Sequence, residues 1–189
     1  MNESQQSRII LGKLEVAHRQ LETAIGMYFN CGDPVSAHTL ATASLEVLRG
    51  LNTARNGSPM LSDLEASGVI RPDKLDLARR VFRGAQNFFK HADKDPRAVI
   101  DFNPEATAFY LHDAVEKYRE LSKENPPIVR VFALWFRVQW TEVFHFPNGE
   151  GKGLAIVRLG YPLNDKAKFF AEFFPRYVAE ASEPRSRPG

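Results

Sequence analysis

The sequence contains a single cysteine, Cys31, among 189 residues, so no disulfide can form within the chain. A lone thiol suits a reducing compartment, and we expect a cytoplasmic protein. The 25 basic and 23 acidic side chains leave a net charge of +2. This balance excludes a general electrostatic attraction to nucleic acid or to anionic lipid, so any contact with RNA must use a local patch of charge.

Long apolar runs are also missing from the sequence. Charged side chains at Arg130, Arg137 and Glu142 interrupt the most apolar segment, so no run reaches the roughly 20 residues that a membrane-spanning helix needs. The first eight residues, MNESQQSR, lack the basic and then apolar order of a signal peptide. We therefore expect no contact with a membrane.

Motifs that bind cofactors or metals are absent as well. There is no GxxxxGK[ST] loop, no GxGxxG after a strand and no cysteine pair for zinc. A carboxylate-bridged di-metal bundle needs two E-x-x-H motifs, and only Glu15 with His18 provides one. His18 also stands four residues before Glu22, a spacing that favours a surface hydrogen bond. The sequence predicts no cofactor and no metal.

What the chain does have is apolar residues, 43% of the total and including 14 Phe, at helical spacing. The first row, within a helix expected over 7–30, comprises Ile10, Leu14, Ala17, Leu21, Ala24, Ile25 and Tyr28. Gly32 can supply the permissive position that ends this helix. Asp33 can cap a second helix whose first turn contains Pro34. The pattern predicts an all-α protein, an antiparallel bundle of four to six helices.

Two further long helices and one short helix complete the expected bundle domain, residues 1–125. A short helix over 61–67 precedes a long third helix that opens at Pro72 and ends before Pro96. Asn103 can cap a fourth helix that runs to about Asn125. The apolar row of the fourth helix comprises Leu111, Ala114, Val115, Tyr118 and Leu121.

Residues 126–189 form an expected extension packed on the bundle. Strand-forming residues are frequent over 128–146, but Arg130 and Arg137 fall at helical spacing, so we favour a buried fifth helix over a short β-hairpin. The glycine-rich stretch NGEGKG, 148–153, has the composition of a flexible connection. A final helix is expected over 167–181.

The candidate functional residues lie on the third helix. At 100° per residue, Arg80, Arg83, Asn87 and His91 share one side, away from the apolar row. A solvated polar face is the ordinary explanation of such a row. Alternatively, guanidinium groups that bind phosphate beside an imidazole that titrates near neutral pH are the parts that RNA cleavage requires. The sequence leaves both explanations open.

Antiparallel helices followed by a helix with Arg and then His near its end resemble the HEPN superfamily. Arg83 stands eight positions before His91, a wider spacing than in the family pattern. The resemblance implies a metal-independent ribonuclease of a toxin or antiphage system, or an RNA- or nucleotide-binding relative. It further implies that Arg83 or Arg80 binds phosphate, that His91 is the general acid or base and that Asn87 positions it. A homodimer formed across this polar face, and an antitoxin as partner, would follow.

A non-catalytic helical module that dimerises or docks a protein partner is the alternative function, because a helical bundle alone implies no reaction. The position of His38, near the start of the second helix, bears on the choice. If 60–71 crosses the bundle, His38 and His91 can meet, and if 60–71 is a loop they lie apart. The sequence does not distinguish these arrangements.

Overall fold

The computed structural model describes residues 8–60, 62–63, 72–76, 88–89, 96–141 and 150–183. Six α-helices and no strand lie within these ranges, which confirms the all-α prediction. None of these helices is long and apolar enough to cross a membrane. The helices are α1 (Lys13–Phe29), α2 (Pro34–Ala54), α4 (Thr107–Ser122), α5 (Pro127–Gln139), α6 (Glu150–Gly160) and α7 (Lys166–Ser182). The 3-10 turns are η1 (Pro72–Lys74), η2 (Pro104–Ala106) and η4 (Leu163–Asp165).

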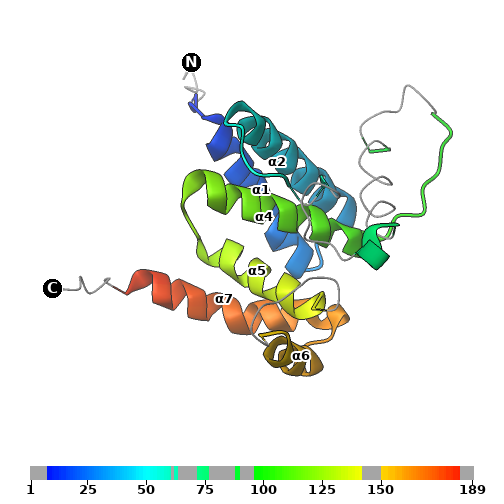
Figure 1. The fold of residues 1–189 in the computed structure, drawn as a ribbon, viewed down its shortest axis with the longest axis vertical. Coiled ribbons are helices and arrows are strands. Elements are labelled where there is room, and N and C mark those ends of the chain that lie inside the picture. The colour runs from blue at the N-terminus through cyan, green and yellow to red at the C-terminus, as the bar shows by residue number, and fades with distance from the viewer. Residues whose placement is uncertain are drawn as a thin grey trace, which may run out of the picture.

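The helices form a stack in which α1, α2 and α4 lie on one side of α5, and α6 and α7 lie on its other side (Figure 1). α1 and α2 pack as an antiparallel pair, and α4 packs against both of them. α5 packs against α1 and α4 on the other side, and α7 packs mainly on α5 at the edge of the stack. The C-terminal helices therefore cover a face of the bundle that α1 and α4 leave apolar.

The first helix is shorter than its apolar pattern predicts. Gly12 is the N-cap, with extended backbone at φ −81° and ψ 161°, so the helix begins at Lys13 rather than near Ser7. Ile10 is fully exposed, and its assignment to the buried row was wrong because it precedes this break. From Ala17 to Tyr28 the predicted row is confirmed as buried.

In the turn between α1 and α2, a different residue from the predicted one takes the left-handed backbone conformation. Cys31, not Gly32, takes the left-handed backbone conformation, at φ 54°. Gly32 instead donates its N–H to the Met27 carbonyl at 2.9 Å, and a Cβ at Gly32 would lie 3.1 Å from the Met27 Cα. The predicted cap is confirmed, since an Asp33 carboxylate oxygen accepts from the Ser36 N–H at 2.7 Å. Hydrogen bonds with the side chain and with the backbone N–H of Ser36 lower the pKa of Asp33.

Aromatic side chains join the bundle to the C-terminal helices. The Phe29 ring, fully buried on α1, lies 6.1 Å from the Phe132 ring and 5.9 Å from the Trp135 ring between centroids. Phe170 on α7 stacks on Phe29 at 4.9 Å. Residues 127–139 form α5, which confirms the helical prediction for this part of the segment. Phe132, Trp135 and Phe136 recur at helical spacing and are all buried.

Two predictions about the C-terminal part have different outcomes. The final helix is confirmed as α7, which contains Pro175. Residues 150–153 of the glycine-rich stretch are helical and do not form a flexible connection, because α6 begins at Glu150 and includes Gly151 and Gly153. Leu154 on α6 is buried, and α6 packs on α5, so tertiary packing outweighs the low helical propensity of glycine. Residues 142–149, where a hairpin or the end of the fifth helix was considered, lie outside the described residues.

The fourth helix agrees with its prediction and the third is only partly described. An Asn103 side-chain oxygen accepts from the Glu105 N–H at 3.0 Å, and η2 leads directly into α4. Pro72 opens the turn η1, and only 72–76 and 88–89 of the predicted third helix are described. Of the short helix predicted over 61–67, only 62–63 are described.

Candidate functional site

The predicted site residues Arg80, Arg83, Asn87 and His91 all lie outside the described residues. Phe88 and Phe89 in the same stretch are described. The Phe89 ring packs edge-on against the His38 ring of α2, with 5.4 Å between centroids and 80° between planes. Phe89 therefore contacts α2 near its start.

His38 begins a row of polar side chains between α2 and α4, which we call the polar seam. Its members are His38, Arg49 and Asn52 on α2, Thr107, Tyr110, Asp113 and Lys117 on α4, and Ser58 and Ser62 after α2. Successive members on one helix are three, four or eleven residues apart, and these spacings place them on one face of that helix. Most members are nevertheless buried, so the seam is part of the interior.

At one end of the seam, His38 is completely buried. Its Nδ1 lies 3.0 Å from the Thr107 hydroxyl oxygen. Besides Phe89, the rings of Phe102 and Tyr110 approach the imidazole at 5.2 and 4.7 Å between centroids, both at steep interplanar angles. The imidazole is thus held by a hydrogen bond and by three aromatic rings, which fix its orientation.

In the middle of the seam, Ser62 links a cation on α2 to an anion on α4. The Arg49 guanidinium donates to the Ser62 hydroxyl, and the Ser62 N–H donates to an Asp113 carboxylate oxygen at 2.9 Å. Burial raises the pKa of Tyr110 to about 12, and the charge of Arg49 opposes this rise. Tyr110 therefore stays protonated at neutral pH.

At the far end, the buried ammonium of Lys117 holds the loop after α2. It donates to the Ser58 carbonyl oxygen at 3.0 Å, to the Ser58 hydroxyl at 3.1 Å and to a Glu120 carboxylate oxygen at 2.7 Å. The Asn52 amide donates to the same Ser58 carbonyl at 2.9 Å. The hydrogen bond from Lys117 is the main reason that the pKa of Glu120 is lowered.

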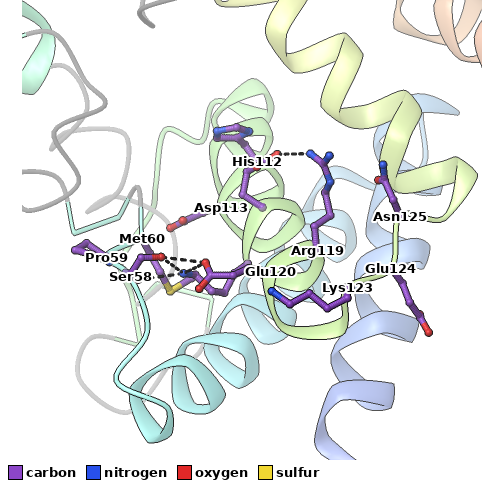
Figure 2. Close-up of a pocket in the computed structure, with 12 residues that line it drawn as sticks. Ser58, Pro59, Met60, His112, Asp113, Arg119, Glu120, Lys123, Glu124 and Asn125 are labelled. Carbon is purple, nitrogen blue, oxygen red and sulfur yellow. Dashed lines mark hydrogen bonds and ion pairs between the residues drawn. The ribbon is translucent and has the colours of Figure 1, made fainter.

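A cavity of about 690 Å³ opens at this end of the seam. Figure 2 shows Ser58 and Glu120 together on one side of α4, with His112 further along the helix. Arg119 and Glu116 both line the cavity and form an ion pair at 3.0 Å. Four carboxylates and three cations lie along the lining, so the opposite charges nearly cancel.

We expect Lys117→Met to lower the free energy of unfolding by about 1–3 kcal/mol, because three hydrogen bonds from a charged donor are lost. Denaturant unfolding at pH 7 measures the change. Lys123→Met is the matched control, since Lys123 lines the same cavity but is exposed, and its effect should stay within about 0.5 kcal/mol. Equal effects of the two substitutions would contradict a structural role for the buried ammonium.

A second polar cluster joins α1, η2 and α7. It lies at the His38 end of the bundle, away from Lys117. The Tyr28 hydroxyl donates to one Glu105 carboxylate oxygen at 2.6 Å, and the Lys166 ammonium donates to the other at 2.7 Å. Burial and the charge of Glu105 raise the pKa of Tyr28. Beside the cluster, a cavity of about 200 Å³ is lined in part by Cys31 and Thr107.

The predicted histidine roles can be compared with the described geometry. His18 Nε2 lies 3.1 Å from a Glu22 carboxylate oxygen, as expected for a helical i, i+4 pair, and the imidazole stacks on Tyr118. His112 stacks on Phe136 at 4.0 Å between centroids. His145 lies outside the described residues. Within the described ranges, no group of three or more His, Cys, Asp or Glu side chains is placed to hold a metal ion.

Sequence reasoning missed Arg49, Tyr110 and Lys117 as members of the seam. A signal was present, because these residues share helix faces with His38 and Asp113. Arg and Lys on an amphipathic helix are normally solvated, however, and their partners at Ser58 and Ser62 are 59 and 13 residues away in the sequence. Only the packing of α4 on α2 brings these groups together.

Comparison of the chain with protein families, with curated proteins and with solved structures finds no match.

Proposed function

We propose that this protein acts on RNA without a metal, as a HEPN-like ribonuclease or RNA-binding protein of a toxin or antiphage system. In this proposal Arg83 or Arg80 binds the phosphate, His91 transfers the proton and Asn87 orients His91. The proposal includes a cytoplasmic location, a homodimer and an antitoxin or RNA as partner. It includes no cofactor.

The contact between Phe89 and His38 carries the proposal. Asn87 and His91 each stand two residues from Phe89 in the sequence, so the contact lies next to the candidate residues along the chain. In the seam, Arg49 supplies a guanidinium, and the buried His38 imidazole is fixed by its hydrogen bond with Thr107. Cleavage of RNA through its 2′-hydroxyl needs a base for that hydroxyl, an acid for the leaving oxygen and a cation for the phosphorane charge.

The test is RNA cleavage by the purified chain in EDTA and, separately, in Mg²⁺. We expect cleavage in both, and a loss of at least about 100-fold in His91→Ala, the usual contribution of a general acid or base. His18→Ala is the matched control, because His18 is paired with Glu22 on α1, and its rate should be that of the wild type. His91→Ala should keep the wild-type melting temperature, and all rates are measured well below the melting temperature of His18→Ala, which loses the stack on Tyr118.

RNA left intact and unbound by the wild type in both buffers would refute the proposal. Equal cleavage by the wild type and His91→Ala would refute the role of His91. Unfolding of His91→Ala would indicate that His91 has a structural role rather than a catalytic one. His91→Gln, which keeps a polar side chain of similar size, then separates the two roles, since a purely structural residue should be rescued by it.

A non-catalytic interaction module is the second candidate function. The observation that favours it is the complete burial of His38, which removes this imidazole from direct contact with a substrate. Exposed apolar side chains on α6 and α7, among them Leu159 and Val178, also favour a partner surface. This function predicts that no histidine variant changes the behaviour of the protein toward RNA, while variants on α7 change its association.

A further inference from the structure

The end of α2 places an asparagine directly before a glycine. α2 ends at Ala54, and Asn56 follows with a left-handed backbone at φ 49°. The Asn56 N–H donates to the Thr53 carbonyl at 3.1 Å, and the Gly57 N–H donates to the Asn52 carbonyl at 3.0 Å. These two hydrogen bonds form a Schellman motif, a common ending of an α-helix.

The geometry of this motif favours both residue types. Asparagine takes a left-handed backbone more readily than most residues other than glycine. A Cβ at Gly57 would lie 1.9 Å from the Asn52 side-chain oxygen, so a larger residue there would displace Asn52. Asn52 is buried, and its amide donates to the Ser58 carbonyl at 2.9 Å, so the displacement would also release the loop. The fold therefore fixes the dipeptide Asn56–Gly57 at this position.

The same dipeptide is chemically labile. The backbone nitrogen after an asparagine can attack the side-chain Cγ, and a five-membered succinimide ring forms. The attacking nitrogen gives up its proton, and the bond from Cγ to the side-chain nitrogen breaks to release ammonia. Water then opens the ring at one of its two carbonyl carbons, which yields aspartate or isoaspartate. Glycine hinders this attack least because it has no side chain, and Asn56 is exposed to the water that the reaction consumes.

Hydrogen bonds of the folded loop restrain the attack. The attacking atom would be the Gly57 nitrogen, whose N–H is donated to Asn52, so the motif must open before the ring can close. One residue further, the buried Lys117 ammonium donates to the Ser58 carbonyl at 3.0 Å and to the Ser58 hydroxyl at 3.1 Å. Lys117 on α4 therefore holds the labile dipeptide in its closed conformation through Ser58.

We propose that Asn56 is a site of spontaneous deamidation, and that the hydrogen bonds from Lys117 to Ser58 set its rate by limiting how often the loop opens. Water is the co-reactant. Isoaspartate adds one atom to the backbone, so Ser58 cannot return to Lys117 in its present register. Either product adds a carboxylate two residues from Ser58, whose hydroxyl already donates to Glu120 at 3.0 Å. Modification therefore favours the open loop, and the inference is independent of any activity toward RNA.

Peptide mass spectrometry of the full chain, incubated at pH 8 and 37 °C, tests the inference. We expect the peptide with Asn56 to gain the mass difference between an amide and a carboxyl group, partly as isoaspartate. Asn125 is the internal control, because it is exposed but precedes Pro126, whose nitrogen carries no proton to give up. Asn148 and Gly149 fall in a separate peptide, so the two sites are counted apart. Asn56→Gly keeps the left-handed backbone and should hold its melting temperature while that of the wild type falls during incubation.

Lys117→Met tests the restraint on the loop. Without the buried ammonium the open loop is more populated, so deamidation of Asn56 should be about 5- to 30-fold faster. Lys123→Met is the matched control for charge, since Lys123 is exposed on the same cavity, and its rate should stay within about twofold of the wild type. Phe29→Leu is the control for stability. It weakens the core at the end of α1, where α2 begins rather than ends, and should leave the rate unchanged.

Three results would overturn the inference. An Asn56 that stays unmodified in both the wild type and Lys117→Met would exclude the site. Equal rates in these two chains would exclude the restraint by Lys117. Equal acceleration by Lys117→Met and Phe29→Leu would mean that the reaction starts from the globally unfolded chain and not from an opened loop. Should Lys117→Met fail to fold, Ser58→Ala replaces it, since it removes only the hydroxyl bonds to Lys117 and Glu120, and it should give a smaller acceleration.

Discussion

Phe29→Ala is expected to lower the free energy of unfolding by about 3–5 kcal/mol, the usual cost of removing a large buried aromatic ring. Phe29 is completely buried and meets rings from two other helices, Phe132 and Trp135 on α5 and Phe170 on α7. Its loss leaves a cavity where three helices join, and none of these large rings can move far enough to fill it.

Urea unfolding followed by circular dichroism measures this change. Phe29→Leu should cost less, about 1–1.5 kcal/mol, because most of the buried volume remains. Val35→Ala is a control at an exposed apolar position on α2 and should change stability by less than about 0.5 kcal/mol. A cost below 1 kcal/mol for Phe29→Ala would show that α1 does not hold the C-terminal helices through this ring.

His112 should make the protein sensitive to acid. Burial, and secondarily the charge of Arg119, lower the pKa of His112 from 6.5 to about 3. Between these values the unfolded chain binds a proton that the folded chain does not. The contribution of His112 is therefore fully present above pH 6.5 and is lost as the pH falls towards 3. The expected loss is about 3 kcal/mol between pH 7 and pH 4.

The comparison with His112→Phe isolates this effect. Phenylalanine can keep the stack on Phe136, which lies 4.0 Å from the imidazole between centroids, but it cannot bind a proton. Unfolding free energies measured from pH 7 to pH 4 should therefore fall less steeply in the variant. The difference between the two curves belongs to His112, because the carboxylates are common to both. Parallel curves would mean that His112 is protonated in the folded protein at pH 4.

Local chemistry made much of the fold predictable. Asp33 before Pro34 and Asn103 before Pro104 are signals that act within a single turn, and both capping hydrogen bonds form as expected. The buried row of α1 from Ala17 to Tyr28 follows from spacing alone. These features could be predicted because the residues that decide them are neighbours in the chain.

Errors arose where distant packing decided the structure. NGEGKG has the composition of a loop, yet residues from Glu150 onward are helical where α6 packs on α5. Ile10 has the spacing of a buried residue, but the extended backbone at Gly12 separates it from α1. The polar seam could not be predicted either, because Lys117 acquires its role only when the loop at Ser58 reaches α4.

The cluster of Tyr28, Glu105 and Lys166 has a consequence for the order in which the chain folds. Its two hydrogen bonds join residues 77 and 61 positions apart, whereas α1 and α2 are adjacent in the sequence. Contacts between distant residues require large loops to close, so they form late. We expect the α1–α2 pair to form first and α7 to dock last. During synthesis, the aromatic side of α5 then stays uncovered until Lys166 and the helix after it leave the ribosome, and in that interval the nascent chain is most prone to aggregate.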